Sequence, residues 1–309
     1  RHYLCFKNKF IIYERTKEQN QGSKPIERIN MTIFGRNRQV LMDIVDEAKK
    51  LNGQSDKGFV SIFSRRYDNW NLICKKPHRP IDSIVSKDNL VQDIVDTIKM
   101  FESSEEWYQK RGIPWHTGIL LCGPPGNGKT SIIFTAASVL NKHLAIINLG
   151  EPELTLTYLV CLLQSLPENS MLVLEDIDCV NATHDREVKK DSDGDVIEQL
   201  DLASILNVLD GFTTCHGMIT FMTTNYPEKL DAALVRPGRM DKTYTINNPN
   251  SDEVAAMLVR FFPLATQEEI HKFATIVPKD TNMATVQGHL MTYRHDINQV
   301  LTNKVGNES

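Results

Sequence analysis

The sequence predicts an α/β protein in three parts: a small, mixed, β-rich N-terminal domain, a parallel sheet flanked by helices, and a helical lid. From Ile81 onward, apolar runs of strand length alternate with segments of helical periodicity, the pattern of a parallel sheet with crossover helices. After Pro249 the strand signals stop, and only helical patterns remain. We therefore expect the chain to divide into residues 1–80, 81–249 and 250–309.

The N-terminal domain is assigned from local patterns within residues 1–80. Residues 29–33 alternate apolar and polar side chains with a period of two, which is typical of a half-buried strand. Residues 40–51 repeat apolar side chains at helical spacing, and residues 59–74 have the composition of a hairpin. Pro80 follows the last of these signals, so we place the end of the domain there.

The central part contains five apolar segments of strand length, each separated from the next by helical or polar sequence. We expect strands at residues 118–122, 143–149, 171–177, 218–224 and 243–246. An opening helix carries one apolar stripe, formed by Leu90, Ile94, Ile98 and Phe101. Residues 200–209 are apolar on nearly every face, which predicts a buried helix.

Composition excludes several classes of protein. Hydrophobic residues make up 41% of the chain and charged residues 24%, so wholesale disorder is excluded. No apolar run reaches the about 18 residues of a membrane span, so we expect the chain itself to be soluble. The first residue is Arg1, and we expect any membrane anchor to lie upstream of it. The six cysteines form no C-x-x-C pair, which argues against a zinc ribbon or a disulfide scaffold.

Charge is distributed unevenly along the chain. Residues 1–80 hold 17 Lys and Arg against 8 Asp and Glu, a balance of +9, whereas the remaining residues have a balance of −13. A basic N-terminal domain suits a nucleic acid, an anionic membrane surface or an acidic protein. It equally suits a basic sheet that complements the acidic body of the same chain, and charge alone leaves these readings open.

A polar, charged stretch interrupts the central part at residues 181–199, and we expect a mobile insertion there. Residues 191–195 resemble part of a calcium loop. An EF-hand needs glycine at its sixth position and an acidic residue at its twelfth. Aligning on Gly194 places Lys189 first and Leu200 twelfth, so we expect no calcium site.

A phosphate-binding motif follows the first central strand. Residues 123–130 satisfy G-x-x-x-x-G-K-[ST] directly after an apolar strand and at the start of a helix. Backbone N–H groups of such a loop, with the helix N-terminus, surround phosphates. We expect Lys129 to reach the β- and γ-phosphates of ATP, and the Thr130 hydroxyl to coordinate Mg²⁺. The predicted binding residues are Gly123, Pro124, Pro125, Gly126, Asn127, Gly128, Lys129, Thr130 and Ser131.

Acidic residues end a later strand, where Glu175 and Asp176 follow an apolar run 45 residues after Thr130. A P-loop site needs one acid for the metal and its water shell, and another group to orient the attacking water. Acids that end a strand can also serve only to solvate its tip. The phosphate-binding motif favours the catalytic interpretation.

Two further segments carry residues suited to the same chemistry. Asn225 ends the next strand, where it can hydrogen-bond the γ-phosphate or the attacking water. Arg236 and Arg239 bracket a Pro-Gly turn, which suits a cation delivered to the phosphate of another subunit. Taken alone, each of these residues is better explained as a solvated loop residue, and the motifs that precede them favour the catalytic interpretation.

These segments match those of AAA ATPases in order and spacing. They resemble the Walker A, Walker B, sensor-one and arginine-finger segments, at residues 123–130, 174–178, 223–225 and 230–241. Further segments are similar to one branch, which includes the mitochondrial translocase that inserts the Rieske iron–sulfur protein into respiratory complex III. The segments similar to that branch are residues 105–114, 174–178, 202–211, 221–225 and 285–293. Residues 1–80 resemble the later part of its middle domain.

The resemblance implies a homo-oligomeric ring, a heptamer, that couples Mg²⁺-dependent ATP hydrolysis to the translocation or chaperoned assembly of a folded protein. The cargo implied is a Rieske-type protein if the host is a mitochondrion. The location implied is the mitochondrial inner membrane in a eukaryote and the cytoplasm otherwise, with membrane attachment only through a segment upstream of Arg1. No nucleic-acid partner is implied.

The chain departs from the wider AAA pattern in its acids. Most AAA proteins have Asp-Glu where this chain has Glu175 and Asp176. By position, Glu175 then takes the role of metal ligand and Asp176 that of water activator. The shorter Asp176 side chain reaches about one methylene less far.

The chain also departs in the parts that handle substrate. Unfoldases of this superfamily carry an aromatic-hydrophobic-glycine pore loop after the second strand, and residues 150–158 lack it. The lid lacks the usual Gly-Ala-Arg triplet. We therefore expect the ring to move a folded cargo and not to thread an extended chain.

Two other functions remain open at this stage. The basic N-terminal domain is compatible with a nucleic-acid motor or loader, which salt-sensitive DNA binding would support. An ATP-gated assembly switch with little turnover is the second alternative. The intact lysine, carboxylates, asparagine and arginines argue against such a switch. A phosphate-release assay distinguishes a switch with little turnover from an active ATPase.

Overall fold

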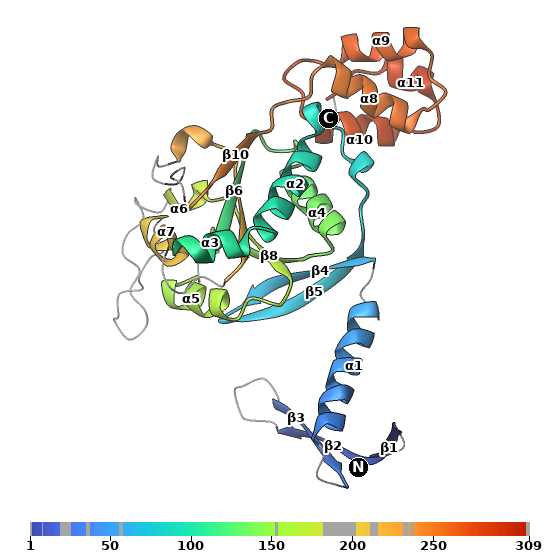
Figure 1. Ribbon diagram of the computed structural model, residues 1–309. Helices are drawn as coiled ribbons and strands as arrows, with labels where there is room; N and C mark the ends of the chain where they lie inside the picture. Colours follow the sequence, from blue (N-terminus) through green and yellow to red (C-terminus); the bar gives the residue numbers. More distant parts are fainter. Residues whose placement is uncertain are drawn as a thin grey trace, which may run out of the picture. The chain divides into compact units, whose positions relative to one another are not determined.

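The computed structural model of the chain (Figure 1) contains two separate sheets, one of three strands and one of seven. The chain divides into two compact units, Arg1–Lys57 and Gly58–Ser309. The structure describes residues 2–7, 9–18, 26–34, 38–55, 58–151, 154–181, 202–210, 216–230, 234, 236 and 238–306. The insertion and the calcium-loop pattern predicted within residues 181–199 lie outside the described residues, apart from Asn181.

The first unit is an antiparallel three-stranded sheet followed by a helix. Its elements are β1 (His2–Phe6), β2 (Lys9–Glu18), β3 (Ile26–Ile33) and α1 (Gln39–Ser55), with the strands in the order β1-β2-β3. Ile11 of β2, which pairs with Ile33 of β3, and Val40 of α1 are buried. The strand predicted from the alternation at residues 29–33 and the helix predicted at residues 40–51 are both confirmed.

The second unit is built on the seven-stranded sheet, whose order is β10-β6-β9-β8-β7-β4-β5. Its strands are β4 (Phe59–Arg66), β5 (Asn69–Pro77), β6 (His116–Cys122), β7 (His143–Asn148), β8 (Ser170–Glu175), β9 (Met218–Thr224) and β10 (Lys242–Thr245). All neighbours pair in parallel except β4 and β5. The predicted α/β fold is confirmed. Because β6, β9 and β8 are adjacent, the segments that follow them meet at one edge of the sheet.

The hairpin of β4 and β5 belongs to this larger sheet, whereas the sequence pattern grouped it with the first 80 residues. Strand β4 pairs in parallel with β7, with Ile62 opposite Leu144, and Val60 is fully buried. The indole nitrogen of Trp70 on β5 donates to the Leu162 carbonyl at 2.8 Å. Packing therefore divides the chain after Lys57. Period-two patterning identifies a hairpin but not the sheet that it extends, because that choice depends on long-range pairing.

Helices cover both faces of the large sheet (Figure 1). Successive buried side chains along a strand point to opposite faces of the sheet. One face packs against α2 (Leu90–Glu102) and α4 (Lys129–Leu140), and the other against α5 (Leu156–Gln164) and α7 (Leu202–Asp210). On β6, Ile119 and Leu121 face the first pair of helices, whereas Leu120 faces the second. The apolar stripe predicted for the opening helix lies on α2, and α7 is the predicted buried helix.

The lid is a separate helical cluster at the C-terminal end of the second unit. Its helices are α8 (Ser251–Phe261), α9 (Gln267–Ile276), α10 (Met283–Thr292) and α11 (Ile297–Thr302). Leu258, Phe273 and Leu290 are fully buried in its core. Asn250 and Thr266 begin α8 and α9 with capping boxes, which fix where each helix starts. Among the described residues, every helix is too short or too polar to cross a membrane.

Candidate nucleotide-binding site

The loop between β6 and α4 has the backbone conformation of a phosphate-binding loop. Gly123 has φ of 143°, and a Cβ there would lie 1.9 Å from the carbonyl oxygen of Ile246. Gly128, at the N-cap of α4, has φ of 85°. Both positions therefore require glycine. The loop leads directly into the N-terminus of a helix, where free N–H groups and the helix dipole favour an anion.

Lys129 is the cation of this loop, and its side chain is almost completely buried. Its ammonium donates hydrogen bonds to the carbonyl oxygens of Gly123 (2.6 Å) and Pro124 (3.1 Å). A third bond reaches Oδ1 of Asn225 at 2.7 Å. Burial lowers the pKa of Lys129, and the neighbouring carboxylates oppose that shift. All three partners are oxygen acceptors, so the oxygens of a phosphate group can take their place.

Thr130 and Glu175 form a pair suited to a magnesium ion. The Thr130 hydroxyl donates to Oε1 of Glu175 at 2.9 Å, which brings two oxygen ligands together beside the loop. Among the described residues, no group of three or more His, Cys, Asp and Glu side chains could hold a metal alone. This donor set fits Mg²⁺, which typically takes one or two protein ligands and completes its shell with phosphate oxygens and water.

Asp176 and Asn225 form the second pair of polar side chains in the site. Asp176 directly follows β8 with φ of 54°, and its N–H donates to the Thr223 hydroxyl at 3.2 Å. The Asn225 amide donates to Oδ1 of Asp176 at 3.3 Å. The structure therefore brings together the lysine, threonine, acids and asparagine that the sequence selected, from loops after β6, β8 and β9. A carboxylate and an amide in this arrangement can hold and orient a water molecule.

Asp178 is a site residue that the motifs did not single out, although it lies within residues 174–178. Its Oδ1 accepts from the Thr224 hydroxyl at 2.8 Å and from the backbone N–H of Asn225 at 3.2 Å. It thereby fixes the backbone that carries the Asn225 side chain. The only signal in the sequence was its place two residues after Asp176, which does not reveal the partner on the next strand.

The P-loop is also joined to the lid, a feature that no local pattern predicted. The Asn127 side chain donates to Oδ1 of Asn248 at 2.8 Å and accepts from the N–H of Met283 at 3.0 Å. The N–H of Ala284 donates to the Gly126 carbonyl at 2.9 Å. Loop, strand end and lid therefore enclose a common space.

A cavity of about 850 Å³ occupies that space. It is lined by the P-loop, by residues 83–87 ahead of α2, by residues 244–250 and by the start of α10. Its walls mix apolar side chains with asparagines and backbone amides. A cavity of this size beside a phosphate-binding loop suits the base and sugar of a nucleotide.

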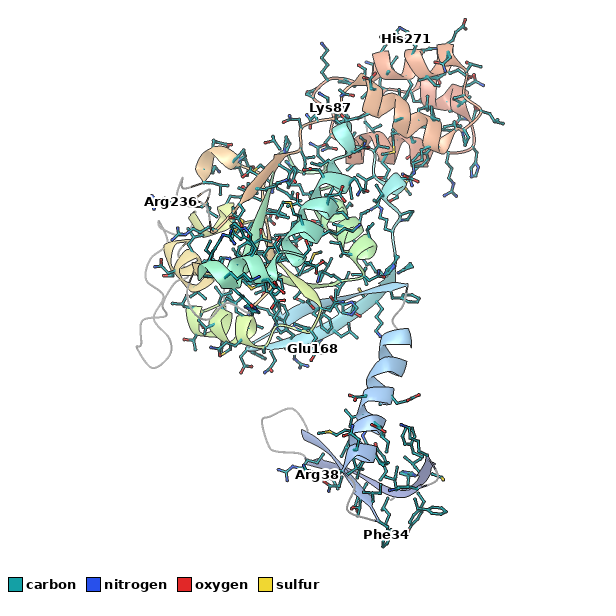
Figure 2. The ribbon with its side chains drawn as sticks, in the orientation of Figure 1. Phe34, Arg38, Lys87, Glu168, Arg236 and His271 are labelled. Atoms are coloured by element: carbon teal, nitrogen blue, oxygen red, sulfur yellow. The ribbon has the colours of Figure 1, made fainter. Side chains whose placement is uncertain are left out.

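The arginine segment lies at the opposite end of β6 from the P-loop. The Arg239 carbonyl oxygen lies so close to Gly118 that a Cβ there would approach it to 1.9 Å. Gly118 and Gly123 are five residue steps apart along extended strand, or about 16 Å. Arg236 is exposed, and Figure 2 shows it at the periphery of this domain. The structure therefore does not bring the two arginines into the P-loop cluster of their own chain.

The segment that carries these arginines is firmly held at its base. The carboxylate of Asp241 accepts from the backbone N–H groups of Gly238 (2.9 Å) and Gly118 (3.2 Å). It also accepts from the Thr117 hydroxyl at 3.0 Å. The N–H of Arg239 donates to the Arg236 carbonyl at 3.1 Å, which closes a turn. The arrangement presents Arg236 outward from a rigid support.

This fold and this site define a P-loop nucleoside triphosphatase with a helical lid. Three family models match the chain: "BCS1 N terminal" over residues 1–84, "ATPase family associated with various cellular activities (AAA)" over 119–248, and "Mitochondrial chaperone BCS1-like, ATPase lid domain" over 251–304. The chain belongs to the BCS1-like family of AAA ATPases. The first of these models includes the β4–β5 hairpin, although in space that hairpin extends the ATPase sheet.

Curated relatives match almost the whole chain. The human mitochondrial chaperone BCS1 is 32% identical over 303 residues, which cover 96% of this chain and 72% of the human protein. The zebrafish (Danio rerio) mitochondrial chaperone BCS1 is 33% identical and is covered to the same extent. The probable mitochondrial chaperone bcs1 of Schizosaccharomyces pombe is 33% identical over 93% of this chain and 64% of its own length. The resemblance expected from the motifs is confirmed.

Proposed function

We propose that the chain hydrolyses ATP with Mg²⁺ at the interfaces of a homo-oligomeric ring and uses the cycle to move a folded protein. The observation that carries this proposal is the convergence of Lys129 and Thr130 with Glu175, Asp176 and Asn225 at one edge of the sheet. A bound magnesium ion supplies positive charge to the phosphates of ATP. Lys129 would hold those phosphates through the hydrogen bonds that its ammonium can donate.

We assign Glu175 to the metal and Asp176 to the attacking water. The hydrogen bond from Thr130 to Glu175 supports the first role, because these two groups then share one metal ion. The contact between Asn225 and Asp176 supports the second, since the amide holds the carboxylate beside the lysine. Asp176 acts as the proton acceptor for the water, and Asn225 fixes its position.

We assign Arg236 and Arg239 to the active site of a neighbouring subunit. The Arg239 backbone lies against Gly118, about 16 Å along β6 from Gly123 at the start of the P-loop, which favours action across an interface. A cation supplied in trans stabilises the charge of the transferring phosphoryl group. A closed ring gives every P-loop such a neighbour. We take the ring to be a heptamer, as the resemblance to this branch implies.

A folded cargo is favoured by the segment that follows β7. Leu154 is only 5% exposed and belongs to the sheet core, and Leu156 and Tyr158 pack against the same core. Glu151 forms an ion pair with Arg65 of β4, whose side chain is buried. These contacts hold the segment against its own domain. None of the three apolar side chains is presented as a flat ring for gripping an extended chain.

We further propose that the cargo is a Rieske-type iron–sulfur protein and that the ring works at the mitochondrial inner membrane. The relatives support the compartment, since they are named mitochondrial chaperones. The cargo follows from the branch that the chain resembles. Membership of this family favours a protein cargo over the nucleic acid that the basic N-terminal domain alone would allow.

A mixing titration tests hydrolysis between subunits. The Lys129→Ala variant should lose tight nucleotide binding, because it lacks the buried cation that faces the phosphates. A double variant, Arg236→Ala with Arg239→Ala, should bind nucleotide but turn it over very slowly. Mixed rings should recover ATPase activity, since a Lys129→Ala subunit can donate arginines to a neighbour whose P-loop is intact. Zero activity at every mixing ratio would contradict the proposal.

A further inference from the structure

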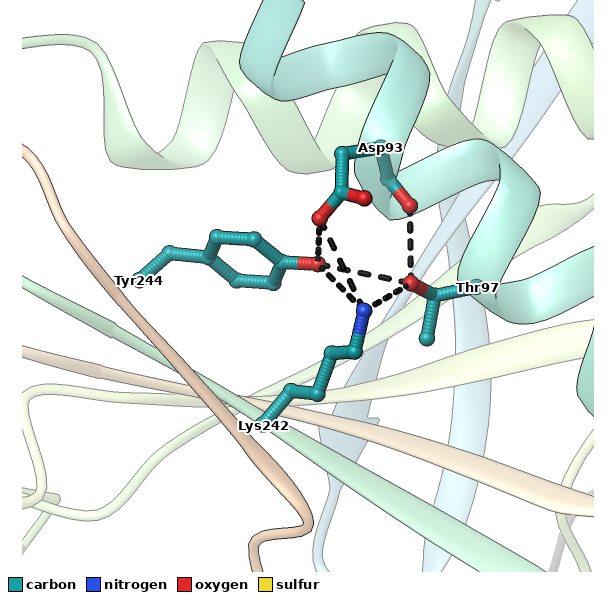
Figure 3. A network of polar contacts seen from close by, with 4 residues as sticks. All are labelled: Asp93, Thr97, Lys242 and Tyr244. Carbon is teal, nitrogen blue, oxygen red and sulfur yellow. Dashed lines mark hydrogen bonds and ion pairs between the residues drawn. The ribbon is translucent and has the colours of Figure 1, made fainter. Parts of the chain in front are cut away.

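Four polar side chains form a closed network between α2 and β10, at the side of the nucleotide cavity (Figure 3). The Tyr244 hydroxyl donates to Oδ2 of Asp93 at 2.5 Å. The Lys242 ammonium donates to the Thr97 hydroxyl at 2.7 Å and lies 3.6 Å from the Asp93 carboxylate. The Thr97 hydroxyl donates to the Asp93 carbonyl at 2.8 Å, and the Lys242 ammonium lies 3.5 Å from the Tyr244 hydroxyl.

The Tyr244 hydroxyl of this network is held in its protonated form. Burial, together with the hydrogen bond to Asp93, raises the pKa of Tyr244 to about 12. The tyrosine hydroxyl therefore remains a donor throughout the physiological range. Lys242 also forms an ion pair with Asp93, so the network joins a donor and an acceptor from each of the two elements.

Strand β10 is a short element that this network ties to α2. It has four residues, lies at the edge of the sheet and, among the described strands, pairs with β6 alone. Lys242 and Tyr244 are two residues apart and point to the same face of the sheet, toward α2. Thr243 lies between them and is exposed. The network therefore attaches β10 to the helix that packs above it.

The two ends of β10 lead to the two functional parts of the chain. At its start, Asp241 secures the turn that carries Arg236 and Arg239. Just past its end, the N–H of Ile246 donates to the Cys122 carbonyl at 2.7 Å, immediately before the P-loop. A displacement of β10 along β6 would therefore move the arginine segment relative to the nucleotide site.

We propose that Asp93, Thr97, Lys242 and Tyr244 are positioning residues that fix β10 and thereby set the arginine segment for the neighbouring subunit. The inference rests on the proposed function, because it requires the arginines to act across an interface. Asp93 and Tyr244 also line the nucleotide cavity, whereas Lys242 and Thr97 do not. Variants of Lys242 and Thr97 therefore separate an effect on the arginines from an effect on the chain's own nucleotide.

The experiment uses the mixed rings described above, with the network variant placed in one subunit type at a time. Donor subunits carry Lys129→Ala and intact arginines, and acceptor subunits carry Arg236→Ala and Arg239→Ala with an intact P-loop. Lys242→Met removes the ammonium and keeps the aliphatic stem. Thr97→Val removes the hydroxyl, and Thr97→Ser keeps it as the matched control. Thermal unfolding of each variant and its ring size by gel filtration report on folding and assembly.

In donor subunits, Lys242→Met and Thr97→Val should each lower the ATPase rate of the mixture about tenfold or more, since small misplacements of a catalytic group are costly. The same changes in acceptor subunits should leave the rate within about twofold, and Thr97→Ser should have no effect in either. Equal losses on both sides, a loss confined to acceptors, or no loss at all would overturn the inference. An inactive parent mixture would instead overturn the proposed function, and this inference with it.

Discussion

Replacement of Arg236 or Arg239 by alanine should lower ATP turnover by about 10³- to 10⁵-fold while nucleotide binding persists. That range corresponds to about 4–7 kcal/mol of transition-state stabilisation. The expected split arises because the arginine segment lies at the far end of β6 from the P-loop of its own chain. The arginines then contribute to the transition state at a neighbouring subunit and not to ground-state binding in their own.

The measurement is steady-state phosphate release together with the affinity for a non-hydrolysable ATP analogue. Arg294→Ala is the matched control, because it removes an exposed arginine from the lid. It should leave both quantities unchanged. Turnover within about twofold of the parent protein for both Arg236→Ala and Arg239→Ala would contradict their assignment as arginine fingers.

Asp176→Asn should retain ATP and lower hydrolysis by about 10²- to 10⁴-fold, the usual contribution of a general base. An amide of the same shape keeps the contact with Asn225 but cannot accept a proton from water. Glu175→Gln should mainly raise the Mg²⁺ concentration needed for activity, because it removes the charge of the proposed metal ligand beside Thr130.

Single-turnover hydrolysis across a Mg²⁺ titration separates these two effects. Glu168→Gln is the control. Glu168 is exposed and lies two residues before the start of β8, whereas Glu175 lies at its end (Figure 2). It should behave as the parent protein. If Glu175→Gln instead traps bound ATP at normal Mg²⁺ affinity, the roles of the two acids are exchanged.

Much of the fold followed from local signals. The five central strands and the buried helix each have a periodicity that their own residues determine. The hairpin of β4 and β5 was recognised as a hairpin, but not as part of the large sheet. Its membership in the large sheet depends on pairing between β4 and β7, about 80 residues apart in the chain, and no local pattern encodes such a pairing.

The candidate site also combines residues that short motifs predict with contacts that no local pattern predicts. Lys129, Thr130 and the strand-end acids belong to short motifs, so the sequence located them. The contacts of Asn127 with the lid, and of Asp178 with the strand end at Thr224, join segments that are distant in sequence. The network around Tyr244 is of this second kind, since an aspartate and a threonine on one helix give no sign of a lysine and a tyrosine about 150 residues later.

Transport of a folded cargo is the part of the proposed function that can be tested most directly. A Rieske-type iron–sulfur protein fused to a hyperstable fluorescent domain provides the cargo, and fluorescence is followed during ATP turnover while transport is measured in parallel. We expect transport to require an intact Lys129 and fluorescence to remain constant throughout. Loss of fluorescence that depends on ATP and on Lys129 would mean that the cargo is unfolded by threading, and would contradict transport in the folded state.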